Sequence, residues 1–75
     1  MNLTDVALNQ KVYIEDILGT PKVKRRLLDM GLTKNTEVKV LGHAPFGDPL
    51  KISVRGYTLS MRKEEATKIK VREKQ

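Results

Sequence analysis

The sequence predicts a small, mainly β protein: a partly closed barrel of about five short strands, with one short α-helix after the first strand. Two observations support this fold class. Hydrophobic and polar residues alternate over several short segments, as they do in strands that bury one face. One segment, 21–30, instead repeats its hydrophobic residues at helical spacing. Closure of the sheet hides strand edges that otherwise promote aggregation, which favours a barrel over an open sheet.

The length and composition indicate one domain, 1–75. The chain has 75 residues, of which 39% are hydrophobic. That proportion is enough for a small core and too high for a disordered chain. No repeat, low-complexity tract or linker divides the sequence. Residues 72–75 are polar and have nothing apolar to anchor them, so we expect a loose tail there.

The first predicted strand is 11–17. Val12 and Ile14 alternate with polar residues and would share a buried face. Ile17 falls out of this phase, which predicts a bend or bulge before it. The same alternation predicts further strands at 37–40, 50–54 and 57–61, and a last short strand around Ile69 and Val71.

Two further segments between the predicted strands have a recognisable conformation. Arg55-Gly56 separates two alternating segments, which is typical of a two-residue hairpin because glycine accepts the positive φ of primed turns. Lys63–Ala66 is expected to form a single helical turn before the last strand. Both segments keep the connections short, as a small barrel requires.

The predicted helix has a start signal and a stop signal. Thr20 can cap the first amides, and Pro21 suits the first turn because its missing N–H is not needed there. Gly31 stands where a left-handed cap belongs, and Leu32 can supply the apolar contact of that cap. A helix this short depends on docking against the sheet. Its docking side is predicted to contain Val23, Leu27 and Met30.

The composition excludes several kinds of site. No cysteine is present, so disulfides, thiolate metal sites and thiol catalysis are excluded. His43 is the sole histidine; with Asp48 it would form at most a weak, open metal site, so we interpret both as ordinary loop residues. The glycines and hydroxyl residues form neither a phosphate-binding loop nor a nucleophile elbow. We therefore predict no enzymatic activity, no cofactor and no metal site.

The sequence also predicts where in the cell the protein is located. No apolar stretch approaches the ~18 residues of a spanning helix. Met1–Gln10 lacks the basic start and the long apolar segment of a signal peptide. We expect a cytoplasmic protein that does not insert into a membrane.

Positive charge is the strongest electrostatic feature of the chain. Fifteen Lys and Arg residues stand against nine Asp and Glu residues, a formal net charge of +6. Such a charge favours nucleic acid, an anionic membrane surface or an acidic protein face as partner. The basic residues cluster on the predicted helix, where they would contact phosphates or an acidic protein, or would form only the solvated side of an amphipathic helix. The cluster comprises Lys22, Lys24, Arg25 and Arg26, with Lys34 just beyond.

The three aromatic residues are ambiguous. Tyr13 and Tyr57 lie on alternating strands, where they would serve equally as the rim of the core or as stacking platforms for bases. Phe46 lies at a loop tip between Pro45 and Gly47. An exposed phenylalanine there would either fold back as a lid on the barrel, which we favour, or contact a partner.

Four short motifs follow one another along nearly the whole chain: 26–32 (RLLDMGL), 45–56 (PFGDPLKISVRG), 59–66 (LSMRKEEA) and 69–71 (IKV). Their order and spacing resemble those of the FeoA family, in which a block R-L-x-x-M-G-L is followed by P-x-G-D-P-I-x-I-x-V-x-G, then by an R-x-x-E-A segment and a closing I-x-V. Asn35 stands in a turn where the family usually has Pro-Gly, and Asn also adopts the left-handed conformation. Met61 replaces the usual Leu, which conserves volume.

The resemblance implies an SH3-like β-barrel and a small cytoplasmic accessory protein of bacterial ferrous iron uptake. Proteins of this kind are expected to bind and modulate the membrane permease FeoB from its cytoplasmic side. The contact would be protein–protein, with the GTP-binding domain of FeoB or its membrane part. The sequence does not decide between them, nor the sign of any effect on GTP hydrolysis.

Residues on the helix and in the loops are the predicted partner contacts. The charged members would orient the partner, and the two leucines would add apolar contact provided that they are exposed. Leu27, Met30 and Gly31 are predicted to be structural, although they make the motif recognisable. The candidate partner-binding residues are Arg25, Arg26, Leu28, Asp29, Leu32 and Phe46.

Two other classes of function stay open. Small barrels with a positive surface also bind RNA, and such binding would weaken steeply with salt. Pairing between edge strands of two copies is the third class, since small barrels of this kind often keep an open edge. We expect a monomer and no specific nucleic acid.

Overall fold

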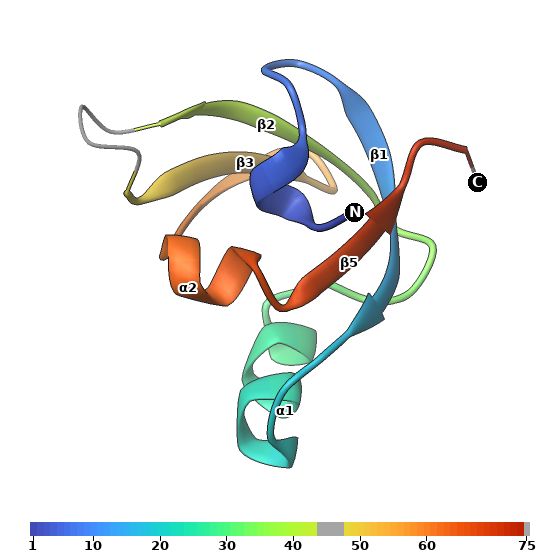
Figure 1. Ribbon diagram of the computed structural model, residues 1–75, viewed down its shortest axis with the longest axis vertical. Helices are drawn as coiled ribbons and strands as arrows, with labels where there is room; N and C mark the ends of the chain where they lie inside the picture. The colour runs from blue at the N-terminus through green and yellow to red at the C-terminus, as the bar shows by residue number, and fades with distance from the viewer. Residues whose placement is uncertain (44–47, 75) are drawn as a thin grey trace.

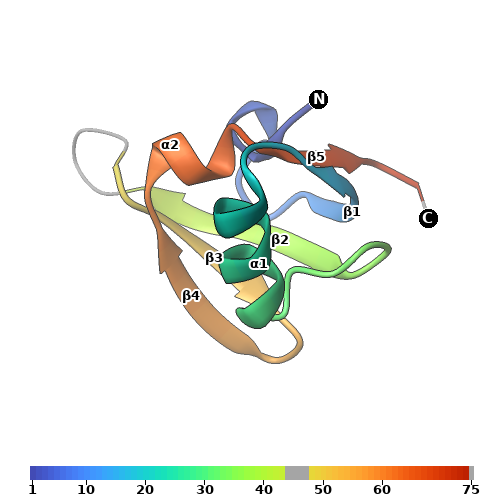
Figure 2. The same ribbon diagram turned by 90° about the horizontal axis from the view of Figure 1, so that it is seen from below.

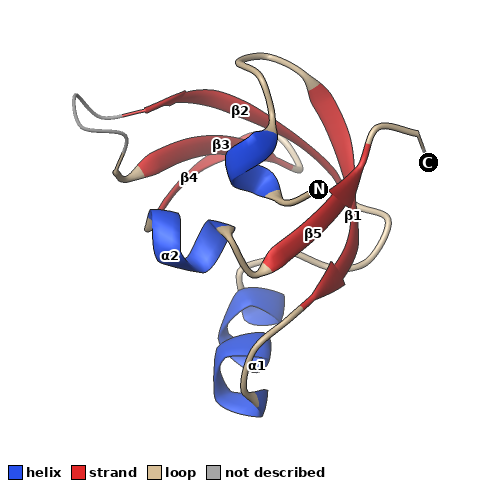
Figure 3. Ribbon diagram, in the orientation of Figure 1, coloured by secondary structure: helices blue, strands red, loops and turns tan. Residues whose placement is uncertain are grey.

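The computed structural model describes residues 1–43 and 48–74. Five strands enclose the core, α1 extends from one end of the barrel, and α2 connects β4 to β5 (Figures 1 and 3). The elements in chain order are a 3₁₀ turn η1 (Leu3–Asp5), β1 (Lys11–Ile17), α1 (Pro21–Asp29), β2 (Glu37–His43), β3 (Leu50–Val54), β4 (Tyr57–Met61), α2 (Lys63–Ala66) and β5 (Ile69–Arg72).

The strands form one antiparallel sheet in the order β4-β3-β2-β1-β5. The sheet curls strongly, so that its two outermost strands lie on different sides of the core (Figure 2). This arrangement confirms the predicted small, partly closed barrel with a short helix after the first strand. The two-residue turn between β3 and β4 has φ of 49° at Arg55 and 85° at Gly56, which confirms the predicted hairpin.

The core is built from the apolar residues that alternate with polar ones along the strands and face the interior. Leu50, Ile52 and Val54 of β3 are all buried, as are Val12 and Ile14 of β1. Every residue that the structure describes as buried is hydrophobic. Burial of these side chains is the main favourable contribution to folding in so small a domain.

Two strands contain a bulge. The register of β1 against β5 shifts between Ile14 and Asp16, and this shift turns Ile17 back into the core. The predicted irregularity is thereby confirmed. A second shift, between Val40 and Gly42 of β2, was not predicted, and it leaves Leu41 40% exposed.

Helix α1 begins and ends as the sequence predicts. The N–H of Val23 donates to Thr20 Oγ1 (3.3 Å) at the start. After the last turn Gly31 has φ of 91°, and a Cβ at this position would lie 2.7 Å from the hydroxyl oxygen of Tyr57. That hydroxyl donates to the carbonyl of Met30, so β4 holds the C-terminus of the helix. Glycine is needed here both for its backbone conformation and for the close approach.

Three features differ from the sequence-based expectations. The turn η1 was not predicted; its N-cap Asn2 accepts from the N–H of Thr4 (2.8 Å), and it buries Leu3 completely. Strand β2 runs to His43, three residues beyond the predicted end. Arg72 is the last residue of β5 and not the start of a loose tail, because its guanidinium donates to the carbonyl of Ile14 (3.4 Å).

Candidate functional site

Helix α1 turns its basic residues away from the barrel. Leu27 is fully buried, and Val23 and Met30 are half-buried against the core. These three residues fix the rotation of the helix, and the positions between them face solvent. The exposed positions hold Lys22, Lys24, Arg25 and Arg26.

Arg26 is already engaged within the molecule. Its guanidinium forms an ion pair with Glu65 of α2, whose side chain is only 17% exposed. The other carboxylate oxygen of Glu65 accepts from the N–H of Arg62 (3.1 Å) at the start of α2. Arg26 therefore links the two helices, and its role in orienting a partner stays a prediction.

Leu28 lies in a groove between α1 and β1. The side chain is 46% exposed, although the adjacent Leu27 is fully buried. The groove has a volume of about 180 Å³, and both apolar and charged side chains line it. It is lined by Ile14, Glu15, Asp16, Ile17, Lys24, Leu28 and Lys34.

The groove brings together charges of both signs. Lys24 and Lys34 come from α1 and the turn after it, and Glu15 and Asp16 come from the bulged part of β1. Glu65 of α2, which pairs with Arg26, does not line this groove. Acidic residues are scarce on the helix itself, but the fold places Glu15 and Asp16 next to it from β1. This acidic side of the groove was not predicted, and the only related signal in the sequence was the irregularity before Ile17.

The other predicted contact residues divide into three outcomes. Leu32 is fully buried, so its predicted role as an exposed apolar contact is wrong. It folds back onto the barrel because the left-handed Gly31 reverses the chain, and its N–H donates to the carbonyl of Leu27 (3.2 Å). Arg25 and Asp29 are exposed one turn apart on the outer side of α1, and Phe46 lies outside the described residues.

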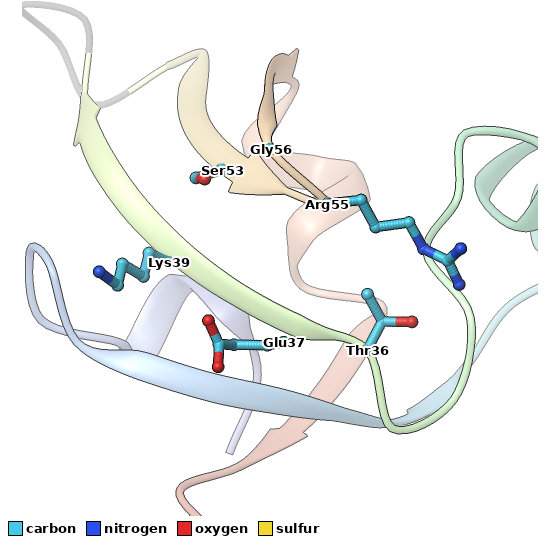
Figure 4. Close-up of a pocket in the computed structure, with 6 residues that line it drawn as sticks. All are labelled: Thr36, Glu37, Lys39, Ser53, Arg55 and Gly56. Carbon is cyan, nitrogen blue, oxygen red and sulfur yellow. The ribbon is translucent and has the colours of Figure 1, made fainter.

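A second depression lies on the outer face of the barrel (Figure 4). It is open and polar, with a volume of about 350 Å³. Its carboxylate, Glu37, lies 3.9 Å from Lys11 Nζ. Arg55 points away from the depression and donates to Thr33 Oγ1 (3.0 Å). The lining residues are Thr36, Glu37, Lys39, Ser53, Arg55 and Gly56.

Asp48, considered above as a possible partner of His43, has a structural function. Its carboxylate accepts from the N–H of Lys63 (2.9 Å) and lies 3.8 Å from Arg62 Nε, at the N-terminus of α2. Among the Asp and Glu side chains that the structure describes, no three converge as metal ligands would. No helix within 1–43 and 48–74 is long and apolar enough to cross a membrane.

Comparison with known proteins identifies the family. The family model for the FeoA domain matches residues 1–73. A Porphyromonas gingivalis protein, an Fe(2+) transport protein A/Fe(2+) transporter FeoB fusion, is 30% identical over 71 residues, which are 95% of this chain. This chain corresponds to only 8% of the length of that fusion protein.

Two solved structures have the same fold. The NMR structure of a FeoA-like protein from Clostridium acetobutylicum is 42% identical, with a TM-score of 0.88; the match covers 96% of this chain and 84% of that one. FeoA from Stenotrophomonas maltophilia, a procaryotic SH3 domain protein crystallised with zinc, is 26% identical, with a TM-score of 0.74 and coverage of 96% and 89%. The expectation of an SH3-like barrel is therefore confirmed, and the chain belongs to the FeoA domain family.

Proposed function

We propose that this protein is a non-enzymatic, cytoplasmic accessory factor of bacterial ferrous iron uptake that binds FeoB and modulates it. The observation that carries the proposal is the fusion protein of Porphyromonas gingivalis, in which a FeoA domain and FeoB are parts of one chain. Fusion raises the effective concentration of one module at the other, which is useful when separate proteins must meet. The Stenotrophomonas FeoA is itself described as a candidate ferrous iron transport activating factor.

The groove beside α1 is the surface that we assign to this contact. Its volume of about 180 Å³ is below the roughly 300–1,000 Å³ typical of small-molecule sites, and it is suited to a single apolar side chain of a partner. Leu28 offers exposed apolar area in the groove, and Lys24 and Lys34 supply positive charge. Arg25 and Asp29 would orient the partner from the outer side of the helix.

The mixed charge of the groove favours a protein over RNA as the partner. Glu15 and Asp16 lie on the same groove as the two lysines, and carboxylates repel a phosphate backbone. Binding to RNA would also fall steeply with salt, with a slope of about −0.7 per neutralised phosphate on single strands. We expect only weak, non-specific retention of RNA, measured as binding to a single-stranded oligonucleotide at two salt concentrations.

The test is a titration of isotope-labelled protein with FeoB of the same organism. The purified GTP-binding domain is used first, and the full-length permease in detergent second, each with and without nucleotide. We expect amide shifts to concentrate at Ile17, Lys24, Leu28 and Lys34. If neither form of FeoB binds in any nucleotide state, the proposal is wrong.

Leu28→Asp is the decisive variant. It places a charge in the groove where an apolar side chain was exposed, so affinity should fall by at least about tenfold while the fold is retained. Leu8→Asp is the matched control, because Leu8 is 54% exposed and lies outside the groove. Equal weakening by both variants, or unfolding of Leu28→Asp, would remove the groove from the assignment.

A further inference from the structure

Strand β4 is an open edge of the sheet. It pairs with β3 on one side, and no strand formed by the described residues pairs with it on the other (Figure 2). Because the turn at 55–56 has two residues, Val54 and Tyr57 form a hydrogen-bonded pair, and the pairs alternate from there. Tyr57, Leu59 and Met61 therefore direct their backbone groups towards β3. Thr58 and Ser60 direct theirs outwards.

The outward groups have no partner in the described part of the chain. No hydrogen bond from another element reaches the N–H or C=O of Thr58 or Ser60 there. Both residues are exposed, so water solvates these four groups in the free protein. They present the backbone pattern that an added strand would pair with.

The opposite edge of the sheet is protected. Strand β5 pairs with β1, and the N-terminal residues cover much of its other side. Asn2 forms a bridge with Lys70, and the N–H of Val71 donates to the carbonyl of Met1 (2.9 Å). The register of β5 against β1 is also interrupted by the bulge. Bulges, covering segments and charged residues are the usual means of blocking edge pairing.

Within the part of the chain that the structure describes, β4 has no bulge, no covering strand and no charged residue. The strand Tyr57–Met61 contains no charged residue and no proline. Its register against β3 is uninterrupted from one end to the other. The edge at β5 is thus blocked, whereas the edge at β4 can still pair with an added strand. This difference is expected where one edge serves for binding.

A second copy of the chain is a poor occupant of this edge. To use all four outward groups, two β4 strands must pair antiparallel with Thr58 opposite Ser60 of the other copy. That register brings the Arg55-Gly56 turn of one copy close to Arg62 and Lys63, which follow β4 in the other. Like charges brought close together repel, and each copy carries a net charge of +6.

We propose that β4 binds an extended segment of a partner protein that carries acidic residues at both ends. The segment would add a sixth strand through the backbone of Thr58 and Ser60. Its acidic residues would meet Arg55 at one end of β4 and Arg62 and Lys63 at the other. This surface is separate from the groove beside α1, and the proposal does not depend on FeoB being the partner.

The probe is a synthetic peptide of five alternating Thr and Val residues, flanked by two Glu at each end. The same peptide with Lys in place of Glu is its counterpart. In the free protein we expect fast amide hydrogen exchange at Thr58 and Ser60, and slow exchange at Leu59. The Glu peptide should slow exchange at Thr58 and Ser60, and the Lys peptide should bind at least about tenfold more weakly.

Ser60→Pro is the decisive variant. It removes an outward N–H and leaves the ladder to β3 intact, as proline does on edge strands, and Glu-peptide affinity should fall at least about tenfold. Ser60→Ala keeps the N–H and should bind like the unmodified protein. If Ser60→Pro does not fold, Thr58→Glu replaces it, because an exposed carboxylate there would repel the Glu peptide.

Three results would overturn the proposal. The first is strong protection of the Thr58 and Ser60 amides in dilute free protein, and the second is Glu-peptide binding that neither Ser60→Pro nor Thr58→Glu weakens. The third is a dimer in sedimentation equilibrium that Ser60→Pro abolishes, since a second copy would then be the occupant. Leu28→Asp should leave peptide binding unchanged, so failure here is distinguishable from failure of the groove assignment.

Discussion

The two sides of α1 differ in almost every respect. The inner side, with Leu27 at its centre, is buried in the barrel and ends at a glycine that contacts Tyr57. The outer side exposes Leu28 between charged residues. The stretch RLLDMGL contains both sides within seven residues. Its recognisable positions Leu27, Met30 and Gly31 pack against the barrel or end the helix, and the positions between them, Leu28 and Asp29, are exposed.

The largest loss of stability is expected from truncation of the inner leucine, Leu27. Leu27→Ala opens a cavity under a fully buried side chain, which typically costs about 2–5 kcal/mol of unfolding free energy. A core of this size supplies only about 3–5 kcal/mol, so the substitution should remove a large part of the stability of the domain. Leu28→Ala, one residue further, should stay within about 0.5 kcal/mol of the unmodified protein. Urea denaturation of both variants measures the difference, and similar losses would mean that the two sides are not distinct.

Substitution of Gly31, at the end of the inner side, should reduce stability nearly as much. Gly31→Ala places a Cβ in a left-handed conformation and against the Tyr57 hydroxyl, and we expect a loss of about 1–3 kcal/mol. In the Tyr57→Phe background the close contact is gone, so the same substitution should cost less. A double-mutant cycle by thermal denaturation separates the two contributions. An equal cost in both backgrounds would show that backbone conformation alone demands the glycine.

The smallest effect is expected on the outer side. Arg26→Gln removes the ion pair with Glu65 and leaves the bond from Arg62 to that carboxylate in place. The Arg26 side chain is 61% exposed, so its loss should cost less than about 1 kcal/mol. High salt should reduce the difference between the two proteins further. A large loss that salt does not change would indicate that the pair is part of the packed interior.

Features set by local sequence were predictable. The cap at Thr20, the left-handed Gly31 and the turn at 55–56 each follow from the conformations that a few adjacent residues allow. The alternation of strand 50–54 likewise placed its buried side correctly. The resemblance to a family then added the barrel type, which periodicity alone did not give.

Features that depend on distant segments were not predictable from the sequence. Glu65 meets Arg26 from 39 residues further along the chain. The groove beside Leu28 exists because a bulge in β1 brings Glu15 and Asp16 next to α1. Leu32 is hydrophobic and is the last residue of the motif, so the sequence left it equally suited to the surface and to the core. Leu32 is buried because the chain reverses at Gly31.

The all-hydrophobic core has a consequence for how the strands find their partners. Within the described residues, no polar side chain is buried that would reward one strand alignment over another. Apolar side chains of similar size tolerate sliding by two residues, because such a slip returns the same kind of residue to the same face. The alignment must therefore be fixed outside the core, by the bulges in β1 and β2 and by the left-handed residues Asn35, Arg55 and Gly56. In this domain the interior provides stability, and the turns and irregularities provide uniqueness.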